Sequence, residues 1–132
     1  MHAHAVVWID HHQARIISFH REASDQSVVH AHNRKSHLHT KAGSHEGYRA
    51  AEDISFFQSV ADRLTGVQAL LVCGPAGAKT EFAEYLRRHA PGLAKSLTEI
   101  IAMDKVTDGE LLSAARLHFK RTDRLQPQAG AA

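Results

Sequence analysis

The sequence contains little cysteine, few aromatic residues and no long apolar run. Its 132 residues include one cysteine, Cys73, which excludes an internal disulfide and a cysteine-based zinc site. Aromatic residues make up 6% of the chain, so aliphatic side chains must fill most of the core. No apolar segment approaches the roughly 20 residues that span a bilayer, and the N-terminus lacks the charged start of a signal peptide. We therefore expect a cytoplasmic protein without a membrane partner.

A large excess of charge of one sign is also absent. Sixteen Lys and Arg residues balance fourteen Asp and Glu residues to a net charge of +2, which does not by itself indicate a nucleic-acid partner. The twelve histidines are unevenly distributed, because ten of them lie in residues 1–45. Imidazole titrates near neutrality, so this part of the chain gains positive charge as the pH falls toward roughly 6.

The spacing of apolar residues predicts one compact domain of alternating strands and helices. A chain of 132 residues is typical of one domain and is long enough to bury a core. We expect strands at 4–10, 14–20, 27–32, 67–74 and 96–103, and helices at 51–64, 78–90 and 107–119. The order βββαβαβα resembles a ribonuclease H-like mixed five-stranded sheet with helices on both faces, its first strand central and parallel to the fourth. We expect this domain to occupy residues 1–120, followed by a flexible tail at 121–132.

Apolar residues three and four positions apart also predict which side chains the helices bury. The expected buried positions are Ile54, Phe57, Val60, Ala61 and Leu64 in the first helix, and Phe82, Tyr85, Leu86 and His89 in the second. Thr107 and Glu110 have the spacing of a capping box at the start of the third helix. Trp8 and Cys73 lie in apolar strand runs, so we expect both in the core.

A histidine-rich basic segment, "HAHNRKSHLHTKAGSHEGYRAAED", occupies residues 30–53. Residues 33–50 lack periodicity, so we predict a long loop, and loops of this length are usually functional. Cations spaced along a loop can reach successive phosphates, and rings can stack on or hydrogen-bond to bases. The predicted RNA-binding residues here are Arg34, Lys35, Lys41 and Arg49, together with His37, His39 and Tyr48. The alternative is a solvated basic loop with no partner.

A second candidate site is the stretch "VCGPAGAKTEF" at 72–82. A strand, a glycine turn and a helix start in succession direct backbone N–H groups toward one place, which suits an anion. The register of a nucleotide-binding P-loop is not met, since two residues rather than four separate Gly74 from Gly77. We therefore expect no nucleotide cofactor, and we expect Lys79 and Thr80 either to contact phosphate or to pack as an ordinary helix start.

These residues carry a resemblance to a known family. "AVVWID" and "ARI", followed downstream by "LLVCGPAGAKTEF", are similar to the central domain of the eukaryotic and archaeal translation release factor and its relative Pelota. The family segment is matched by Gly74, Ala76, Lys79, Thr80 and Glu81. The resemblance spans roughly residues 4 to 119 and is strongest to bacterial single-domain translational machinery proteins. It implies a ribonuclease H-like fold and work at the ribosome.

The same resemblance argues against peptide release. Release factors carry Gly-Gly-Gln in the loop that corresponds to residues 33–50, and no glutamine lies between Gln26 and Gln58 of this chain. We therefore expect a protein that is not an enzyme, has no cofactor, and binds the ribosome or ribosomal RNA. Its expected contacts are those of the basic loop, with a second contribution from the Gly74–Thr80 turn.

Two alternatives use other chemistry. His30, His32, His37 and His39 could form a metal site, because imidazole suits Zn, Ni or Cu, although their spacing matches no established zinc motif. A metal-dependent nuclease would need converging carboxylates, for which the candidates are Asp10, Glu52, Asp53, Asp104 and Asp108. The simpler interpretation is that Asp10 caps a turn and that Glu52 or Asp53 lies at a helix N-terminus.

Overall fold

The computed structural model describes residues 4–20, 23–31 and 45–125, and of residues 45–52 and 123–125 it describes the backbone alone. Nine elements follow one another along these ranges: β1 His4–Ile9, β2 Gln13–Phe19, β3 Ser24–His30, α1 His45–Asp62, β4 Ala69–Gly74, α2 Ala78–His89, α3 Pro91–Ala94, β5 Leu97–Ala102 and α4 Asp108–Leu125. Among the described residues, no helix has the length and apolar character that crossing a membrane requires.

The strands form a mixed five-stranded sheet in the order β3-β2-β1-β4-β5. The central strand, β1, pairs antiparallel with β2 and parallel with β4, so Val7 lies opposite both Ile16 and Val72. Residues 5–9 of β1 are at most 1% exposed, as expected for a strand covered on both faces. The predicted sheet, with its central first strand and parallel fourth strand, is confirmed.

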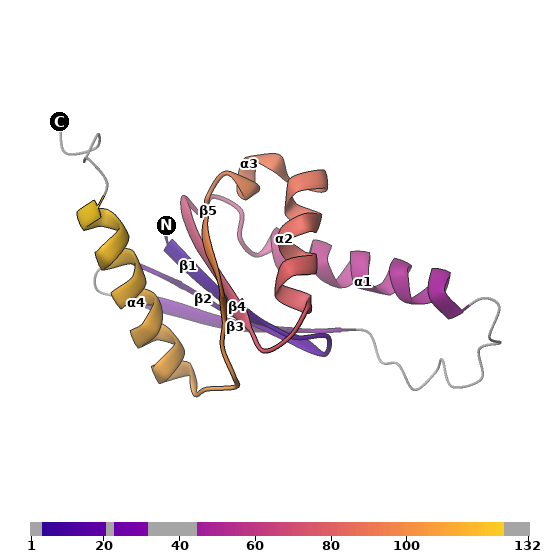
Figure 1. Cartoon of the computed structure of the whole chain (residues 1–132), viewed down its shortest axis with the longest axis horizontal. Helices are drawn as coiled ribbons and strands as arrows, with labels where there is room; N and C mark the ends of the chain where they lie inside the picture. Colours follow the sequence, from indigo (N-terminus) through magenta and orange to yellow (C-terminus); the bar gives the residue numbers. More distant parts are fainter. Residues whose placement is uncertain (1–3, 21–22, 32–44, 126–132) are drawn as a thin grey trace.

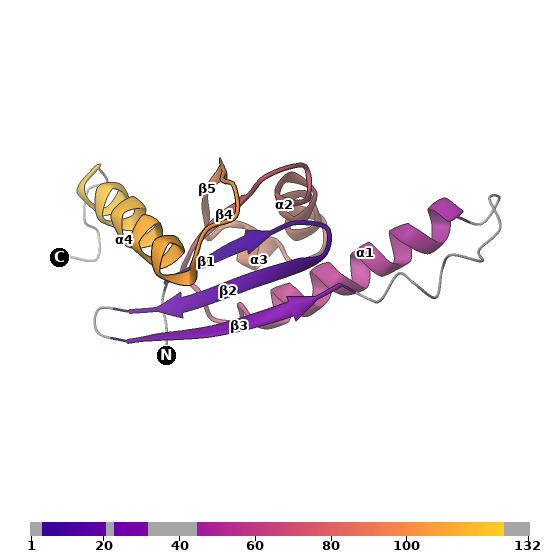
Figure 2. The same cartoon turned by 90° about the horizontal axis from the view of Figure 1, so that it is seen from below.

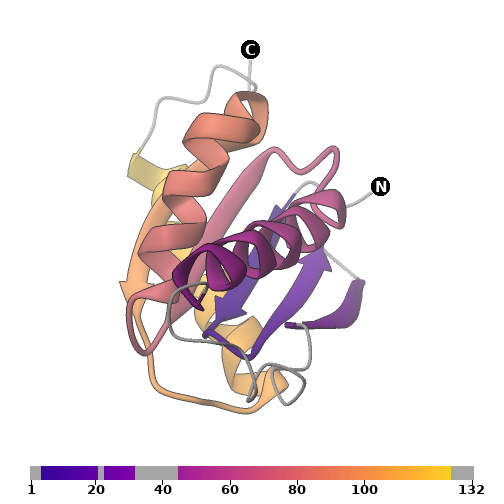
Figure 3. The same cartoon turned by 90° about the vertical axis from the view of Figure 1, so that its right-hand side faces the viewer.

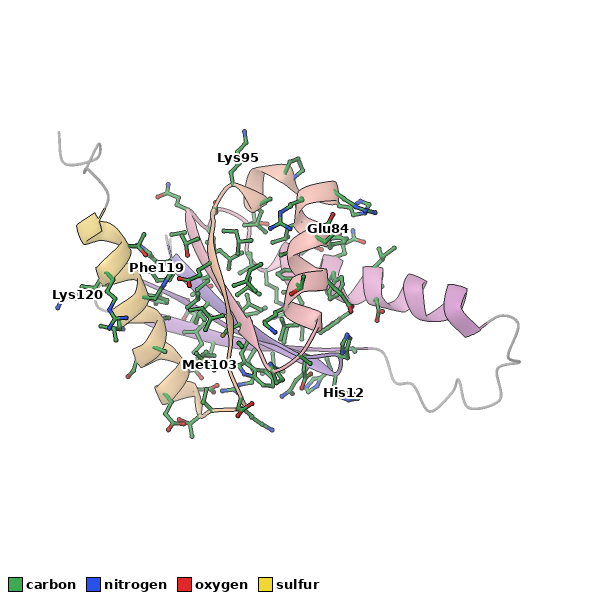
Figure 4. The ribbon with its side chains drawn as sticks, viewed as in Figure 1. His12, Glu84, Lys95, Met103, Phe119 and Lys120 are labelled. Carbon is green, nitrogen blue, oxygen red and sulfur yellow. The ribbon has the colours of Figure 1, made fainter. Side chains whose placement is uncertain are left out.

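Helices cover both faces of the sheet (Figures 1 and 3). On one face, which we call the α1/α2 face, strand residues such as Val7 and Val72 pack with Phe57 and Phe82. On the opposite α4 face, Trp8 and Cys73 are buried in the same cluster as the α4 residues Leu111, Ala115 and Phe119. Figure 4 shows Phe119 directed from α4 toward the sheet and Lys120 directed away from it. The predicted core positions of Trp8 and Cys73 are confirmed.

The first helix begins earlier than the sequence predicts. Residues 45–50, expected in the long loop, form the first turns of α1, because Glu46, Arg49 and Ala50 are good helix formers. This part of α1 runs beyond the sheet (Figures 1 and 2). Further along α1, Ile54, a predicted core residue, is 48% exposed, whereas Phe56, Phe57, Val60 and Leu64 are buried, so Ile54 lies away from the buried side of the helix.

The second helix follows its predicted bounds closely, but two details differ. Phe82 and Leu86 are fully buried and Tyr85 is partly buried. His89 is exposed instead of buried, and its ring lies 4.8 Å from that of Tyr85. Pro91 begins the short helix α3, where the sequence predicted a simple stop, because proline is favoured in a first helical turn.

The capping box of α4 is confirmed. The backbone N–H of Thr107 donates to Glu110 Oε1 at 2.9 Å, and the backbone N–H of Glu110 donates to Thr107 Oγ1 at 3.1 Å. The backbone N–H and the hydroxyl of Thr107 both donate to the Glu110 carboxylate and hold the pKa of that carboxyl below its usual value. Since residues 120–125 contain neither glycine nor proline, α4 continues to Leu125, so the start of the predicted tail at 121–132 is helical. Residues 126–132 lie outside the described residues.

The end of β4 requires a glycine. A Cβ atom on Gly74 would lie 2.1 Å from the carbonyl oxygen of Ile9, which belongs to the neighbouring strand β1. Because that oxygen is a backbone atom, no side-chain rotation could relieve the contact. Gly74 thus allows the carboxyl ends of β1 and β4 to lie close together, and this brings the turns that follow them to one edge of the molecule.

Candidate functional site

The predicted basic loop contributes little described structure to the candidate site. Arg34, Lys35, His37, His39 and Lys41 lie outside the described residues, so their role stays a prediction. Tyr48 and Arg49 lie in the first turns of α1 rather than in a loop, and only their backbone is described. What the structure does define is the end of the sheet at which β3 finishes.

The turn between β1 and β2 lies beside the end of β3. Gln13 pairs with His30 across the sheet, and the backbone N–H of Ala31 donates to the carbonyl oxygen of His12 at 2.8 Å. His12 and His30 are both exposed. Two imidazoles therefore stand at this end of the sheet, next to the point where the predicted basic segment begins.

The Gly74–Thr80 turn reaches the same end of the sheet. β1 and β4 are parallel neighbours, so the turns at their carboxyl ends lie at one edge. His11, after β1, lies 3.3 Å from Glu81 in the first turn of α2, measured from Nε2 to Oε1. This contact joins the β1–β2 turn to the start of α2.

Lys79 and Thr80 lie at the start of α2 as predicted. Gly77 caps the helix without a side-chain hydrogen bond, and its carbonyl oxygen accepts from the N–H groups of Thr80 and Glu81 at 3.1 and 3.0 Å. The Lys79 ammonium donates to the carbonyl oxygen of Ala76 in the same turn. Thr80 is exposed and Lys79 partly so, which leaves both within reach of a solvent-borne anion.

Asp10 has the structural role that its position suggests. Its Oδ1 accepts from the backbone N–H of His12 at 2.8 Å and from that of Gln13 at 2.9 Å, so it caps the β1–β2 turn. Glu52 and Asp53, expected at a helix start, lie well inside α1 because the helix begins at His45. Asp108 pairs with Arg15 on the α4 face, at 2.8 Å. Of the carboxylates considered for a nuclease, Asp10 and Asp108 thus have structural partners, and Glu52 and Asp53 lie within α1.

A metal centre finds no support in the described part of the chain. Within residues 4–20, 23–31 and 45–125, no group of three or more His, Cys, Asp or Glu side chains is placed to hold an ion. His30 is described, whereas His32, His37 and His39 lie outside the described residues. The four-histidine site therefore stays a prediction.

Cys73 is buried at the centre of the sheet and is poorly suited to nucleophilic chemistry. Burial raises the pKa of its thiol to about 12, with the nearby Arg15 charge opposing that rise. The thiol lies 3.5 Å from the carbonyl oxygen of Val7. Since the thiolate is the reactive form, Cys73 is a core residue, as the sequence predicted.

Sequence reasoning did not identify two contacts that organise this region. The His11–Glu81 contact and the Arg15–Asp108 ion pair each join residues far apart in the chain, at sequence separations of 70 and 93. The only signal available was the predicted topology, because parallel strands bring their carboxyl ends to one edge. Residue types and local spacing give no indication of either pair.

Comparisons with known proteins identify the fold. No protein-family model and no curated protein sequence matches the chain. Among solved structures, it is similar to Pelota from Archaeoglobus fulgidus, with a TM-score of 0.58 and 16% identity over 86% of this chain and 30% of that one. It is also similar to the archaeal translation termination factor aRF1, with a TM-score of 0.59 and 17% identity over 84% of this chain and 32% of that one.

A third structure, described only as an archaeal protein, gives a TM-score of 0.60 at 16% identity over 84% of this chain and 32% of that one. At such identities the likeness concerns the fold alone. The chain therefore has the α/β fold of one domain-sized part of these proteins and spans about a third of their length.

Proposed function

We propose that this chain is a translation-associated accessory protein that binds the ribosome or ribosomal RNA without catalysing peptide release. The observation that carries the proposal is the shared fold with domains of Pelota and of an archaeal translation termination factor. The stretch between Gln26 and Gln58 contains no glutamine, so the release chemistry of Gly-Gly-Gln is not proposed for it.

The end of the sheet supports a contact with phosphate. His12 and His30 are exposed there, and Lys79 and Thr80 lie on the neighbouring turn, which His11–Glu81 joins to the same edge. The predicted cations Arg34, Lys35 and Lys41 lie four, five and eleven residues after His30 in the sequence. Lysine, arginine and exposed backbone N–H groups are the usual partners of the phosphate backbone. The proposed interface therefore combines the basic segment with the turn from Gly74 to Thr80.

Co-sedimentation with purified ribosomes at several salt concentrations tests this proposal. We expect binding at low salt that weakens as salt rises, because phosphate contacts release counterions. The double substitution Arg34→Glu with Lys35→Glu should weaken binding and reduce the slope of log affinity against log salt by roughly 1.5. Lys79→Ala should give a smaller loss in the same direction.

A matched control lies at the other end of α2. Arg87→Glu with Arg88→Glu makes the same change in net charge about 12–14 Å along the helix from Lys79. Both arginines are exposed, with Glu84 as their only ion-pair partner in the described residues. Figure 4 shows Glu84 on α2, away from the end of the sheet where His12 lies. Equal loss in both double variants, or no binding at low salt, would refute the proposed interface.

A further inference from the structure

Among the strands of the described residues, β3 forms one edge of the sheet, so one row of its backbone groups pairs with none of them. The backbone N–H of Ala31 donates to His12, and at the other end the N–H of His20 donates to the carbonyl oxygen of Ala23. In an antiparallel pair, hydrogen-bonded residues alternate with those whose backbone groups face outward. The register between β2 and β3 thus assigns the outward row to Ser24, Gln26, Val28 and His30.

The two edges of the sheet differ in how well they resist pairing with another strand. β5 has an irregularity in its register with β4, between Leu70 and Leu71. Each edge strand carries one carboxylate, Asp25 on β3 and Glu99 on β5, so the difference lies in the irregularity. β3 pairs with β2 in continuous register over seven residues and contains neither proline nor lysine. Bulges, prolines and lysines are the usual means of protecting an edge strand. The β3 edge lacks these protections.

The four residues whose backbone groups face outward have their side chains over a part of the sheet that α4 does not cover. Gln26, Val28 and His30 are exposed, and Val28 is 45% exposed although it is a large apolar residue. In Figures 2 and 3, β3 is the outermost strand, with α1 and α4 lying over the faces of the sheet and not outside this edge. Within the part of the chain that the structure describes, no helix or strand therefore blocks the approach of a further strand to β3.

We propose that β3 is a dimerisation edge, which pairs antiparallel with β3 of a second copy of this chain. The strand is self-complementary in one register, centred on Ser27, which places Ser24 opposite His30 and Gln26 opposite Val28 of the second copy. All four residues whose backbone groups face outward then exchange backbone hydrogen bonds across the two-fold axis. A register shifted in either direction leaves some of these backbone groups unpaired. The single charged residue of the strand, Asp25, lies opposite Val29, so no like charges meet.

This dimer would join two five-stranded sheets into one continuous sheet. An interface of one strand pair is small, so the dimer is expected to be weak and to form with rising protein concentration. The contact includes the backbone of His30 but neither His12 nor the Gly74–Thr80 turn, and the proposal does not depend on ribosome binding. Sedimentation equilibrium of the full chain over a range of concentrations should show a reversible monomer–dimer equilibrium. A monomer at all concentrations would overturn the proposal.

A charge exchange tests the register. In Gln26→Lys with Val28→Lys, each lysine meets another lysine across the axis, and the dissociation constant should rise by roughly tenfold or more. In Gln26→Lys with Val28→Glu, each position meets the opposite charge, and dimerisation should return at low salt. Both variants alter the same two exposed positions, so unchanged urea unfolding separates an effect on dimerisation from one on folding. Equal weakening in both would exclude the register centred on Ser27.

A cysteine at the axis provides a second, independent readout. In Ser27→Cys, the two thiols face each other in a non-hydrogen-bonded pair with Cα atoms about 4.5 Å apart, a distance that a disulfide bridges. The native Cys73 is buried and does not compete. In the control Ser24→Cys, the two thiols stand six residues apart along the strand, about 20 Å. Rapid oxidation to a covalent dimer in Ser27→Cys alone is expected, and equal rates in both would contradict the proposed pairing.

Discussion

The α1/α2 face and the α4 face cover the same five strands, but different contacts hold their helices. On the α1/α2 face, α1 and α2 meet through rings, with Phe57 lying 5.6 Å from Phe82 and 5.8 Å from Tyr85 between centroids. On the α4 face, the buried side chains include Arg15, which is the only charged residue buried in the described part of the chain. One face is thus almost wholly apolar, and the other combines apolar packing with directed polar contacts.

The polar contacts of the α4 face tie α4 and the segment before it to three different strands. Trp8 Nε1 donates to the carbonyl oxygens of Met103 and Asp104 at 3.1 and 3.2 Å. Arg15 Nε and Nη2 both donate to Asp108 Oδ1, at 3.1 and 2.8 Å, and the Arg15 guanidinium lies 5.4 Å from the centroid of the Trp8 ring.

The second half of α4 has contacts of its own. Arg116 donates to the carbonyl oxygen of His20, just after β2, at 3.2 Å, and its guanidinium lies over the ring of Phe19. The His118 ring lies 2.7 Å from the hydroxyl of Thr98 on β5. Apolar packing tolerates small rotations of a helix, whereas hydrogen bonds depend on direction. The comparison suggests that packing sets the stability of the α1/α2 face and that polar contacts set the position of α4.

The largest effect is expected on the apolar face, at Phe82. This side chain is fully buried and contacts rings from α1 and α2. Phe82→Ala should lower the free energy of unfolding by about 3–5 kcal/mol, because it loses buried apolar area and leaves a cavity. Urea unfolding followed by circular dichroism measures the loss. Leu117→Ala, at a position that is 48% exposed on α4, is the control and should cost less than about 1 kcal/mol. Similar losses of stability in both variants would contradict the expected difference between the buried Phe82 and the exposed Leu117.

A smaller and more specific effect is expected at the Arg15–Asp108 pair. Asp108→Ala leaves the buried guanidinium without its carboxylate and should cost about 2 kcal/mol, less than a fully buried pair because the Asp108 side chain is 48% exposed. Adding Arg15→Met removes the buried charge and its unpaired Nη1 group, so the double variant should be more stable than Asp108→Ala alone.

A double-mutant cycle in urea measures the coupling between these two residues. Glu84→Ala, which breaks the exposed pairs with Arg87 and Arg88 on α2, is the comparison and should change stability by less than about 1 kcal/mol. If the losses of stability at Arg15 and Asp108 were additive, the two residues would not be coupled, and polar contacts would not distinguish the α4 face from the α1/α2 face.

The contrast between the faces also explains how much of the fold the sequence predicts. The buried strand "HAVVWID" and the capping pair Thr107 and Glu110 depend on neighbours in the chain, and both were predicted correctly. The start of α1 was missed because Gly47 and the histidines obscure any periodicity before Ala50. Ile54 was predicted to be buried because apolar residues lie on more than one side of α1, and the spacing alone did not show that Phe56 is buried instead.

The candidate site was predicted less completely, for a related physical reason. The position of Lys79 and Thr80 at a helix start followed from the local pattern of strand, glycine and helix. The contacts of His11 with Glu81 and of Arg15 with Asp108 required the three-dimensional arrangement of β1, β2, α2 and α4, which local spacing does not contain. Arg15 in particular reads as the polar residue of an alternating strand, and only the structure shows that it is buried.

At neutral pH the smallest effect is expected at Cys73, on the α4 face, and the pH dependence of this effect appears only in alkali. Burial raises the pKa of this thiol from 9.0 to about 12, so the folded state keeps its proton at pH values where the unfolded chain has lost it. Below about pH 9 the thiol is protonated in both states, and stability does not depend on its titration. Between about pH 9 and 12 the free energy of unfolding should fall, by up to about 1.4 kcal/mol per pH unit from this group.

The Cys73→Ala variant isolates this contribution. At pH 7 the substitution should cost about 1 kcal/mol, because it removes a small buried group. As the pH rises from 7 to about 10.5, the wild type should lose about 2 kcal/mol, so the stability difference between the two proteins should shrink and then reverse, since only the wild type has this thiol to titrate on unfolding. Burial also raises the pKa of Tyr85, but this group is present in both proteins and cancels in the difference. A constant difference across this range would mean that the thiol at the centre of the α4 face is accessible to water. The description of the α4 face as a solvent-excluded core with directed polar contacts would then be wrong.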